Sequence, residues 1–108
     1  MDNKTAFLEI FGDSPILKVL DFLIVNEEFD QSMTTIAEEA EVGYSTLKIF
    51  WPKLEKEGIV INTRVVGKAK MYKLNMENPI MKKFRDFYWA ATKHHVNEML
   101  NRKEIVAR

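Results

Sequence analysis

The stretch of sequence that decides the fold is MTTIAEEAEVGYSTLKIFWPKLEKEGIVINTRVVGKAKMYKLNMENP, residues 33–79. Its apolar residues recur first at helical spacing, which predicts a short helix over about 35–41 and a longer one over about 44–57. Gly43 separates the two helices, and Gly58 is the residue type that favours the left-handed position past a helix end. The sequence therefore predicts two helices joined by a glycine turn.

The residues after Gly58 predict a β-hairpin. The apolar period changes from helical to two over 59–66, which is typical of a half-buried strand. A turn follows at 67–70, and the chain returns as a second strand at 71–74. Two helices followed by such a hairpin form a helix-turn-helix with an added wing. In this motif the first helix braces the second, which is free to enter the major groove of DNA.

The segments on both sides of this motif predict further helices. Ser14 and Pro15 suit the cap and the first position of a helix that runs to about Val25. Asn78-Pro79 repeats this signature, and a helical pattern without Gly or Pro follows to about Leu100. The fold class expected is therefore mainly α with a small β-hairpin: a winged helix-turn-helix plus a long C-terminal helix.

Three segments are expected along the chain. Residues 5–11 suit a short helix or an arm that packs on a partner, Ser32-Met33 suits a very short strand, and Thr34 suits the cap of the helix over 35–41. The predicted division is an N-terminal arm or short helix at 1–12, a winged helix-turn-helix DNA-binding domain at 13–77 and a C-terminal dimerisation helix at 78–108.

Residues 33–79 resemble the winged helix-turn-helix transcription regulators common in archaea. The matching patterns are I-A-E-E-A-x-V, S-T-L, W-x-x-L-x-x-x-G-I-V, T-R, G-x-A-x-x-Y-x-L-N and N-P. The resemblance implies a DNA-binding regulator that is usually dimeric. Carried over by position, it also implies a set of core residues, namely Ile36, Ala37, Ala40, Val42, Leu47, Trp51, Leu54, Ile59 and Ile61.

The same alignment of positions leaves six side chains on the outer face of the recognition helix, about 44–57: Tyr44, Ser45, Thr46, Lys48, Ile49 and Lys53. Ser and Thr hydroxyls donate to phosphates or bases, and Tyr44 and Ile49 suit contact with a thymine methyl group. No arginine, the commonest reader of guanine, lies on this face, so we expect an A/T-leaning site. In the basic wing, 64–73, the candidates for phosphate contact are Arg64, Lys68 and Lys70, with Lys73 as a further candidate.

Pro52 departs from an ordinary recognition helix. A proline inside a helix removes one backbone hydrogen bond and kinks the helix, at a cost of about 3 kcal/mol unless it is compensated. Trp51 beside it is a candidate for that compensation. Our hypothesis is that Pro52 separates a DNA-reading half of the helix from a half that anchors it in the core.

The C-terminal helix is too long for one small winged domain to cover. About 22 residues at 1.5 Å each give roughly 33 Å. We therefore expect a homodimer with two-fold symmetry, which would present two recognition helices to a palindromic site. The predicted interface residues are Phe84, Phe87, Tyr88, Ala91 and His95, with Trp89 among the aromatic side chains at the centre. The alternative, that the apolar stripe completes the core of its own chain, applies best to Ile80, Met81 and Phe84.

Charge is polarised along the chain although the net charge is zero. Residues 1–47 carry ten acidic and two basic side chains, a net charge of −8, whereas the rest carries fourteen basic and six acidic side chains, a net charge of +8. A local basic face binds phosphate even in a neutral protein, so the total does not argue against DNA.

Several classes of site are excluded by composition. The absence of Cys excludes disulfides and thiolate metal sites. His94 and His95 are adjacent, so on a helix they diverge and cannot chelate one metal ion. No catalytic set and no cofactor motif is present, so we expect no enzyme, no cofactor and no metal. The chain shows no targeting or membrane segment, which predicts a cytoplasmic protein, and no residue points to a small-molecule effector.

The leading interpretation is a transcription regulator that binds double-stranded DNA as a homodimer. The alternatives are a winged-helix adaptor that binds proteins, since fold does not fix function, and an architectural or partition protein that coats DNA.

Overall fold

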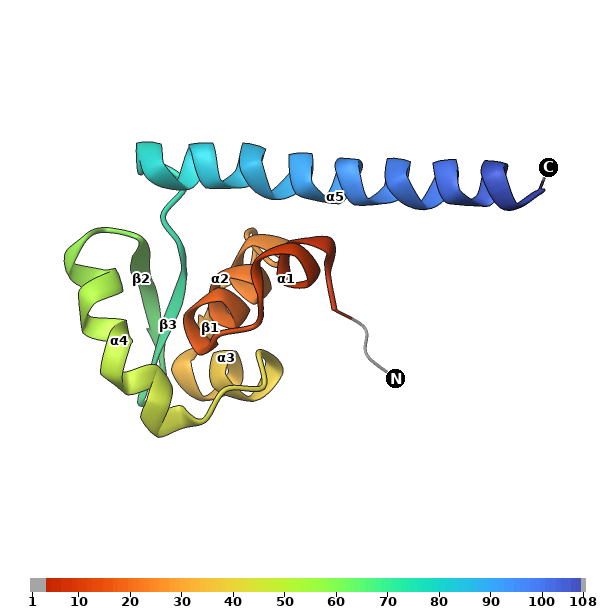
Figure 1. Cartoon of the computed structure of the whole chain (residues 1–108). Helices are drawn as coiled ribbons and strands as arrows, with labels where there is room; N and C mark the ends of the chain where they lie inside the picture. The colour runs from red at the N-terminus through yellow and green to blue at the C-terminus, as the bar shows by residue number, and fades with distance from the viewer. Residues whose placement is uncertain (1–3, 108) are drawn as a thin grey trace.

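The structure, a computed structural model, describes the backbone of residues 4–107 and the side chains of residues 4–102 (Figure 1). Its elements in chain order are α1 (Ala6–Phe11), α2 (Pro15–Val25), β1 (Gln31–Ser32), α3 (Met33–Glu39), α4 (Tyr44–Lys56), β2 (Val60–Val66), β3 (Ala69–Leu74) and α5 (Pro79–Ala107). The chain is mainly helical with a small antiparallel sheet, and a long helix ends it, so the predicted fold class is confirmed. The predictions for residues 1–3 and 108 lie outside the described residues.

The sheet has three strands in the order β1-β3-β2, all antiparallel. The short strand before α3 therefore pairs with the second strand of the hairpin, with Gln31 opposite Tyr72. The hairpin turn consists of Gly67 and Lys68, because Val66 already pairs with Ala69. Gly67 has a φ of 62° at the first central position, which a two-residue hairpin turn of type II′ requires. The turn is thus shorter than the predicted 67–70.

The start of α3 differs from the prediction. Ser32, not Thr34, is the cap, and its Oγ accepts a hydrogen bond from the Thr35 backbone N–H at 3.2 Å. Ser32 leaves the β1 ladder with extended backbone, so strand and helix follow each other directly and Met33 is helical. The other predicted starts are confirmed, with Pro15 at the first position of α2 and Pro79 at the first position of α5.

The core lies between α2, α3, α4 and the sheet. Eight of the nine residues that the sequence resemblance placed in it are buried. The prediction for Ile61 is wrong, because its side chain is 37% exposed. β2 is an edge strand, and only its first residue, Val60, is covered by the helices. From Ile61 onward the hairpin extends past the core as the wing.

The long helix α5 runs along one side of the molecule and projects beyond it (Figure 1). Its first half packs on α1, where the ring of Phe7 lies 5.5 Å from that of Phe84 and 5.4 Å from that of Tyr88. Residues 5–11 thus form a short helix on their own chain. α5 continues to Ala107, past the predicted end at Leu100. Within the described part of the chain, no helix is long and apolar enough to cross a membrane.

A buried carboxylate ties three helices together. Asp21 of α2 is buried, and its Oδ1 accepts hydrogen bonds from the Thr5 hydroxyl at 2.6 Å and from the Tyr88 hydroxyl at 2.7 Å. Thr5 also caps α1 by accepting from the Leu8 N–H. Burial and the bond to Asp21 raise the pKa of Tyr88 well above its usual value of 10.0. This polar contact fixes how α5 sits on the winged body.

Candidate nucleic-acid interface

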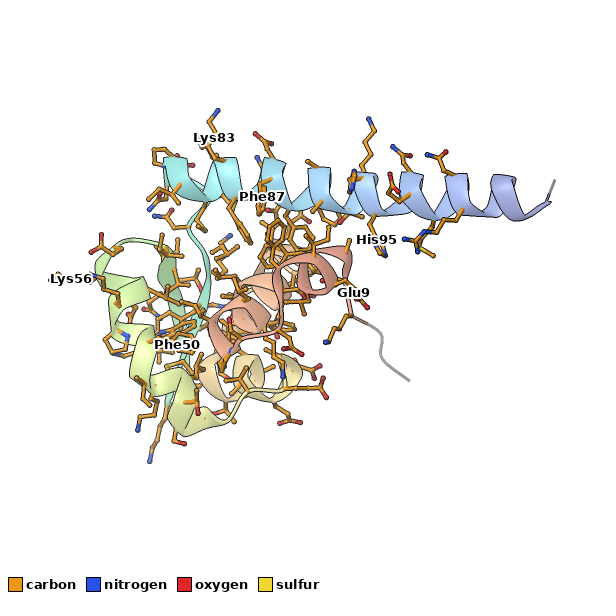
Figure 2. The ribbon with its side chains drawn as sticks, viewed as in Figure 1. Glu9, Phe50, Lys56, Lys83, Phe87 and His95 are labelled. Atoms are coloured by element: carbon orange, nitrogen blue, oxygen red, sulfur yellow. The ribbon has the colours of Figure 1, made fainter. Side chains whose placement is uncertain are left out.

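Helix α4 is held by one apolar face. Leu47, Trp51 and Leu54 are buried at helical spacing, and the Trp51 ring packs edge-to-face on Tyr72 of β3 with 5.2 Å between ring centroids. Successive residues on a helix differ by about 100° in direction, so the side chains opposite these three point to water. Figure 2 shows Phe50 directed toward the interior and Lys56 directed away from it.

The outer face of α4 carries most of the predicted DNA-reading side chains. Tyr44, Ser45, Lys48, Ile49 and Lys53 are exposed, whereas Thr46 is half-buried at the edge of the core. The sequence reasoning missed Lys56, which is exposed in the last turn. Its spacing of seven residues from Ile49, two helical turns, was the signal that would have placed it on the same face.

Pro52 also lies on this outer face. α4 continues unbroken through it, and its side chain is exposed. Because proline has no N–H, the carbonyl oxygen of Lys48 has lost its partner within the helix. The Lys48 side chain itself is oriented by Tyr44, since its Nζ lies 5.5 Å from the centre of that ring, within the range of a cation–π contact.

A groove separates the start of α4 from the wing. Its walls come from the α3 start, the α4 start and the hairpin, and they are Ser32, Met33, Thr34, Tyr44, Val66, Lys68, Ala69, Lys70 and Tyr72. The groove brings Tyr44 of the recognition helix together with Lys68 and Lys70 of the wing. Three of the predicted DNA-binding residues, distant in sequence, therefore line one surface feature.

Arg64 has a different environment from the one expected. Its guanidinium forms a two-point ion pair with Asp30, at 2.8 Å from Nε and 3.1 Å from the second nitrogen. Asp30 also accepts a hydrogen bond from Thr63, and these bonds, that of Arg64 first, lower the pKa of Asp30 from 3.8 to about 2. The charge of Arg64 is therefore matched by a carboxylate of its own chain, whereas no carboxylate among residues 4–102 pairs with Lys68 or Lys70.

The predicted interface residues of α5 divide into two groups. Tyr88 and Ala91 are buried within the chain, and Phe84 and His95 are half-buried, because α1 and α2 lie beneath this part of α5. Phe87 remains 45% exposed, beside Phe11 of α1 (Figure 2). Trp89, which the sequence also predicts at the centre of the interface, is exposed, and so are Val96, Met99 and Leu100 farther along the apolar stripe.

Metal-ligating side chains do not gather anywhere among residues 4–102. No three His, Asp or Glu side chains of this part of the chain form a group that could hold a metal ion.

Comparison with known proteins gave matches among solved structures alone. No protein-family model matches the sequence, and no curated protein matches it. Wild-type ZitR from Lactococcus lactis in complex with DNA matches with a TM-score of 0.56 and 14% identity, over 83% of this chain and 66% of the ZitR chain. A ZitR variant in its apo form matches with a TM-score of 0.61 and 14% identity, over 93% and 81% of the two chains.

The chain spans just under two thirds of the length of the DNA-bound ZitR chain. At 14% identity the likeness concerns the arrangement of the elements rather than any particular side chain. It agrees with the order of helices, sheet and terminal helix described above, and the chain therefore has the winged helix-turn-helix fold.

Proposed function

We propose that this chain is a transcription regulator that binds double-stranded DNA as a homodimer, without catalysis. Helix α4 enters the major groove through its outer face, and the wing rests on the adjacent phosphates. The contacting side chains are Tyr44, Ser45, Thr46, Lys48, Ile49, Lys53, Lys56, Lys68 and Lys70. Arg64 holds the wing in place through Asp30 rather than binding phosphate.

The observation that carries this proposal is the groove between α4 and the wing. Lys68 and Lys70 lie on one wall and Tyr44, with Lys48 over its ring, lies at the opposite side. None of these three lysines has an ion pair among the described side chains. Unpaired lysines beside an exposed helix face are suited to contact the phosphates of DNA when that helix lies in the major groove.

The structural neighbours support the same function. ZitR has been solved in complex with DNA, and its fold is shared by this chain. Fold alone does not determine function, so the support from the neighbours adds to that from the lysines and does not replace it.

The shape of α5 supports the homodimer. The helix projects past the winged body (Figure 1), and its projecting part exposes Val96, Met99 and Leu100, which lie at the i, i+3, i+4 spacing of one helical face. An apolar face on a free helix is stabilised when a second helix covers it. A second copy of α5 is the partner that the two-fold symmetry of most DNA-binding regulators favours.

The test is a titration of mixed genomic duplex DNA, followed by fluorescence anisotropy, at two salt concentrations. The variant with Lys48, Lys68 and Lys70 changed to Ala should bind more weakly, and its salt slope should fall by roughly 5, because a homodimer loses six phosphate contacts and each contact releases about 0.9 counterions. The matched control changes Lys82, Lys83 and Lys93 of α5 to Ala, which alters the net charge equally. Figure 2 shows Lys83 pointing away from the winged body.

Each outcome has a definite meaning. A smaller salt slope in the first variant and not in the control supports the proposal. Equal losses in both variants would contradict the assignment of α4 and the wing. Absence of binding by the folded natural protein would favour the adaptor function, and cooperative coating without preference for any sequence would favour an architectural protein.

A further inference from the structure

Ile49 is exposed to a degree that folding does not explain. Among the described side chains, it is the most exposed of the large hydrophobic residues, at 80%. It belongs to no part of the apolar core, and its β-branched side chain is a weaker helix former than Ala, Leu or Lys. The folded monomer therefore gains nothing from Ile49 that a lysine or glutamate would not provide.

The neighbours of Ile49 on α4 are all suited to DNA. Ser45 lies one turn before it and Lys53 one turn after it, and all three are exposed on the outer face. The face contains lysines but no arginine, so it lacks the side chain that reads guanine with two hydrogen bonds. A large apolar side chain this exposed, between Ser45 and Lys53, indicates an apolar feature in its partner.

We propose that Ile49 determines sequence specificity by contacting the 5-methyl group of thymine. This inference rests on the proposed function. In the major groove the thymine methyl is the one apolar group that base edges display, and uracil differs from thymine by that group alone. Binding sites then carry thymine where Ile49 meets the groove, once in each half-site of a palindrome.

The test compares duplexes with and without the methyl group. Sequences that the natural protein enriches from a random duplex library are remade with deoxyuridine in place of thymidine, and affinities are measured by anisotropy. The natural protein should bind the thymine duplex about fifteenfold more tightly, because each of the two half-sites contributes the factor of about four expected for one buried methyl-sized group. Ile49→Ser should bind both duplexes equally, at the affinity of the natural protein for the uracil duplex.

The matched control is Ile80→Ser, which removes another largely exposed isoleucine, on α5, and should keep the full preference for thymine. A thymine preference that survives in Ile49→Ser would overturn the inference, and so would equal affinities in the natural protein or a failure to enrich any sequence. These outcomes leave the proposed function intact if salt-dependent DNA binding persists. Absence of all DNA binding overturns both.

Discussion

At the scale of single residues, charge in the sequence predicted which wing side chains are exposed cations, but not which of them have a partner in the fold. Lys68 and Lys70 are exposed and form no ion pair with any described side chain, as a basic hairpin tip suggests. Arg64 looked equivalent to them, but Asp30 is 34 positions away and the sequence offers no sign that they meet. The pairing follows from the register of β1 on β3, which brings the segment before β1 close to the wing.

The different roles of Arg64 and Lys68 predict different salt dependence. Lys68→Gln should reduce the slope of log affinity against log salt by about 1.8, because the homodimer loses two phosphate contacts, one from each chain. The double variant Asp30→Asn, Arg64→Gln removes a matched pair of charges and should leave the slope unchanged. Anisotropy at four or more salt concentrations measures both slopes, and an equal reduction in the two variants would place Arg64 on phosphate after all.

The Asp30 carboxylate predicts a loss of stability in acid. Its pKa is about 2 in the folded chain and 3.8 without the fold, so its ion pair contributes fully above about pH 4. The contribution is lost as the pH falls toward 2, because the unfolded chain takes up the proton first. Urea unfolding between pH 5 and pH 2 should therefore show a steeper fall in unfolding free energy for the natural protein than for Asp30→Asn. Parallel curves would contradict this role.

At the scale of elements, the sequence predicted what local chemistry controls and missed what neighbours control. Pro15 and Pro79 mark helix starts correctly. A backbone N–H at the first helical position has no partner within the helix, so a proline there loses no hydrogen bond. The start of α3 was missed because two hydroxyl residues, Ser32 and Thr34, are suitable caps, and pairing of β1 decides between them. The prediction that Ile61 is in the core was wrong because the alternation of apolar residues does not show how much of the strand the helices cover.

The position of Pro52 inside helix α4 predicts that this proline lowers the stability of the folded protein. Pro52→Ala restores the hydrogen bond to the Lys48 carbonyl and should raise the unfolding free energy by about 2 kcal/mol, the cost of an interior proline less its effect on the unfolded chain. Pro79→Ala is the matched control, since a first-position proline costs nothing. Denaturant unfolding measures both. If Pro52→Ala changes neither stability nor DNA affinity, the proline does not divide the helix into two functional halves.

The contact among α1, α2 and α5 predicts the effect of Tyr88→Phe. Loss of the hydroxyl leaves Asp21 with the Thr5 hydroxyl as its one remaining donor in the described chain, and should cost about 1.5–3 kcal/mol, the range for a bond to a charged group. The raised pKa of Tyr88 makes this contribution complete below pH 10 and lost at higher pH. Thermal unfolding should therefore show less alkaline destabilisation in Tyr88→Phe than in the natural protein, with Tyr44→Phe as an exposed control.

At the scale of the whole molecule, the sequence showed an apolar stripe on α5 but not what covers it. The first part of the stripe packs on its own chain, and the second part does not. Tyr88 and Ala91 are covered by their own chain, whereas Val96 and Met99 project past it. Hydrophobic spacing is the same in both stretches, and only the packing of α1 under the first half distinguishes them. The candidate interface therefore lies nearer the end of α5 than the sequence alone placed it.

The projecting part of α5 predicts where a dimer breaks. Val96→Lys with Met99→Lys places two charges in an apolar contact between helices and should raise the dimer dissociation constant at least about a hundredfold, because a buried charge without a partner is strongly unfavourable. Sedimentation equilibrium measures this constant. Lys82→Glu with Lys83→Glu alters the charge of α5 away from the contact, and this control should leave the dissociation constant unchanged. Because a dimer binds two half-sites at once, the monomer should also bind DNA more weakly, and a dimer that persists with both lysines would show that the two copies meet elsewhere.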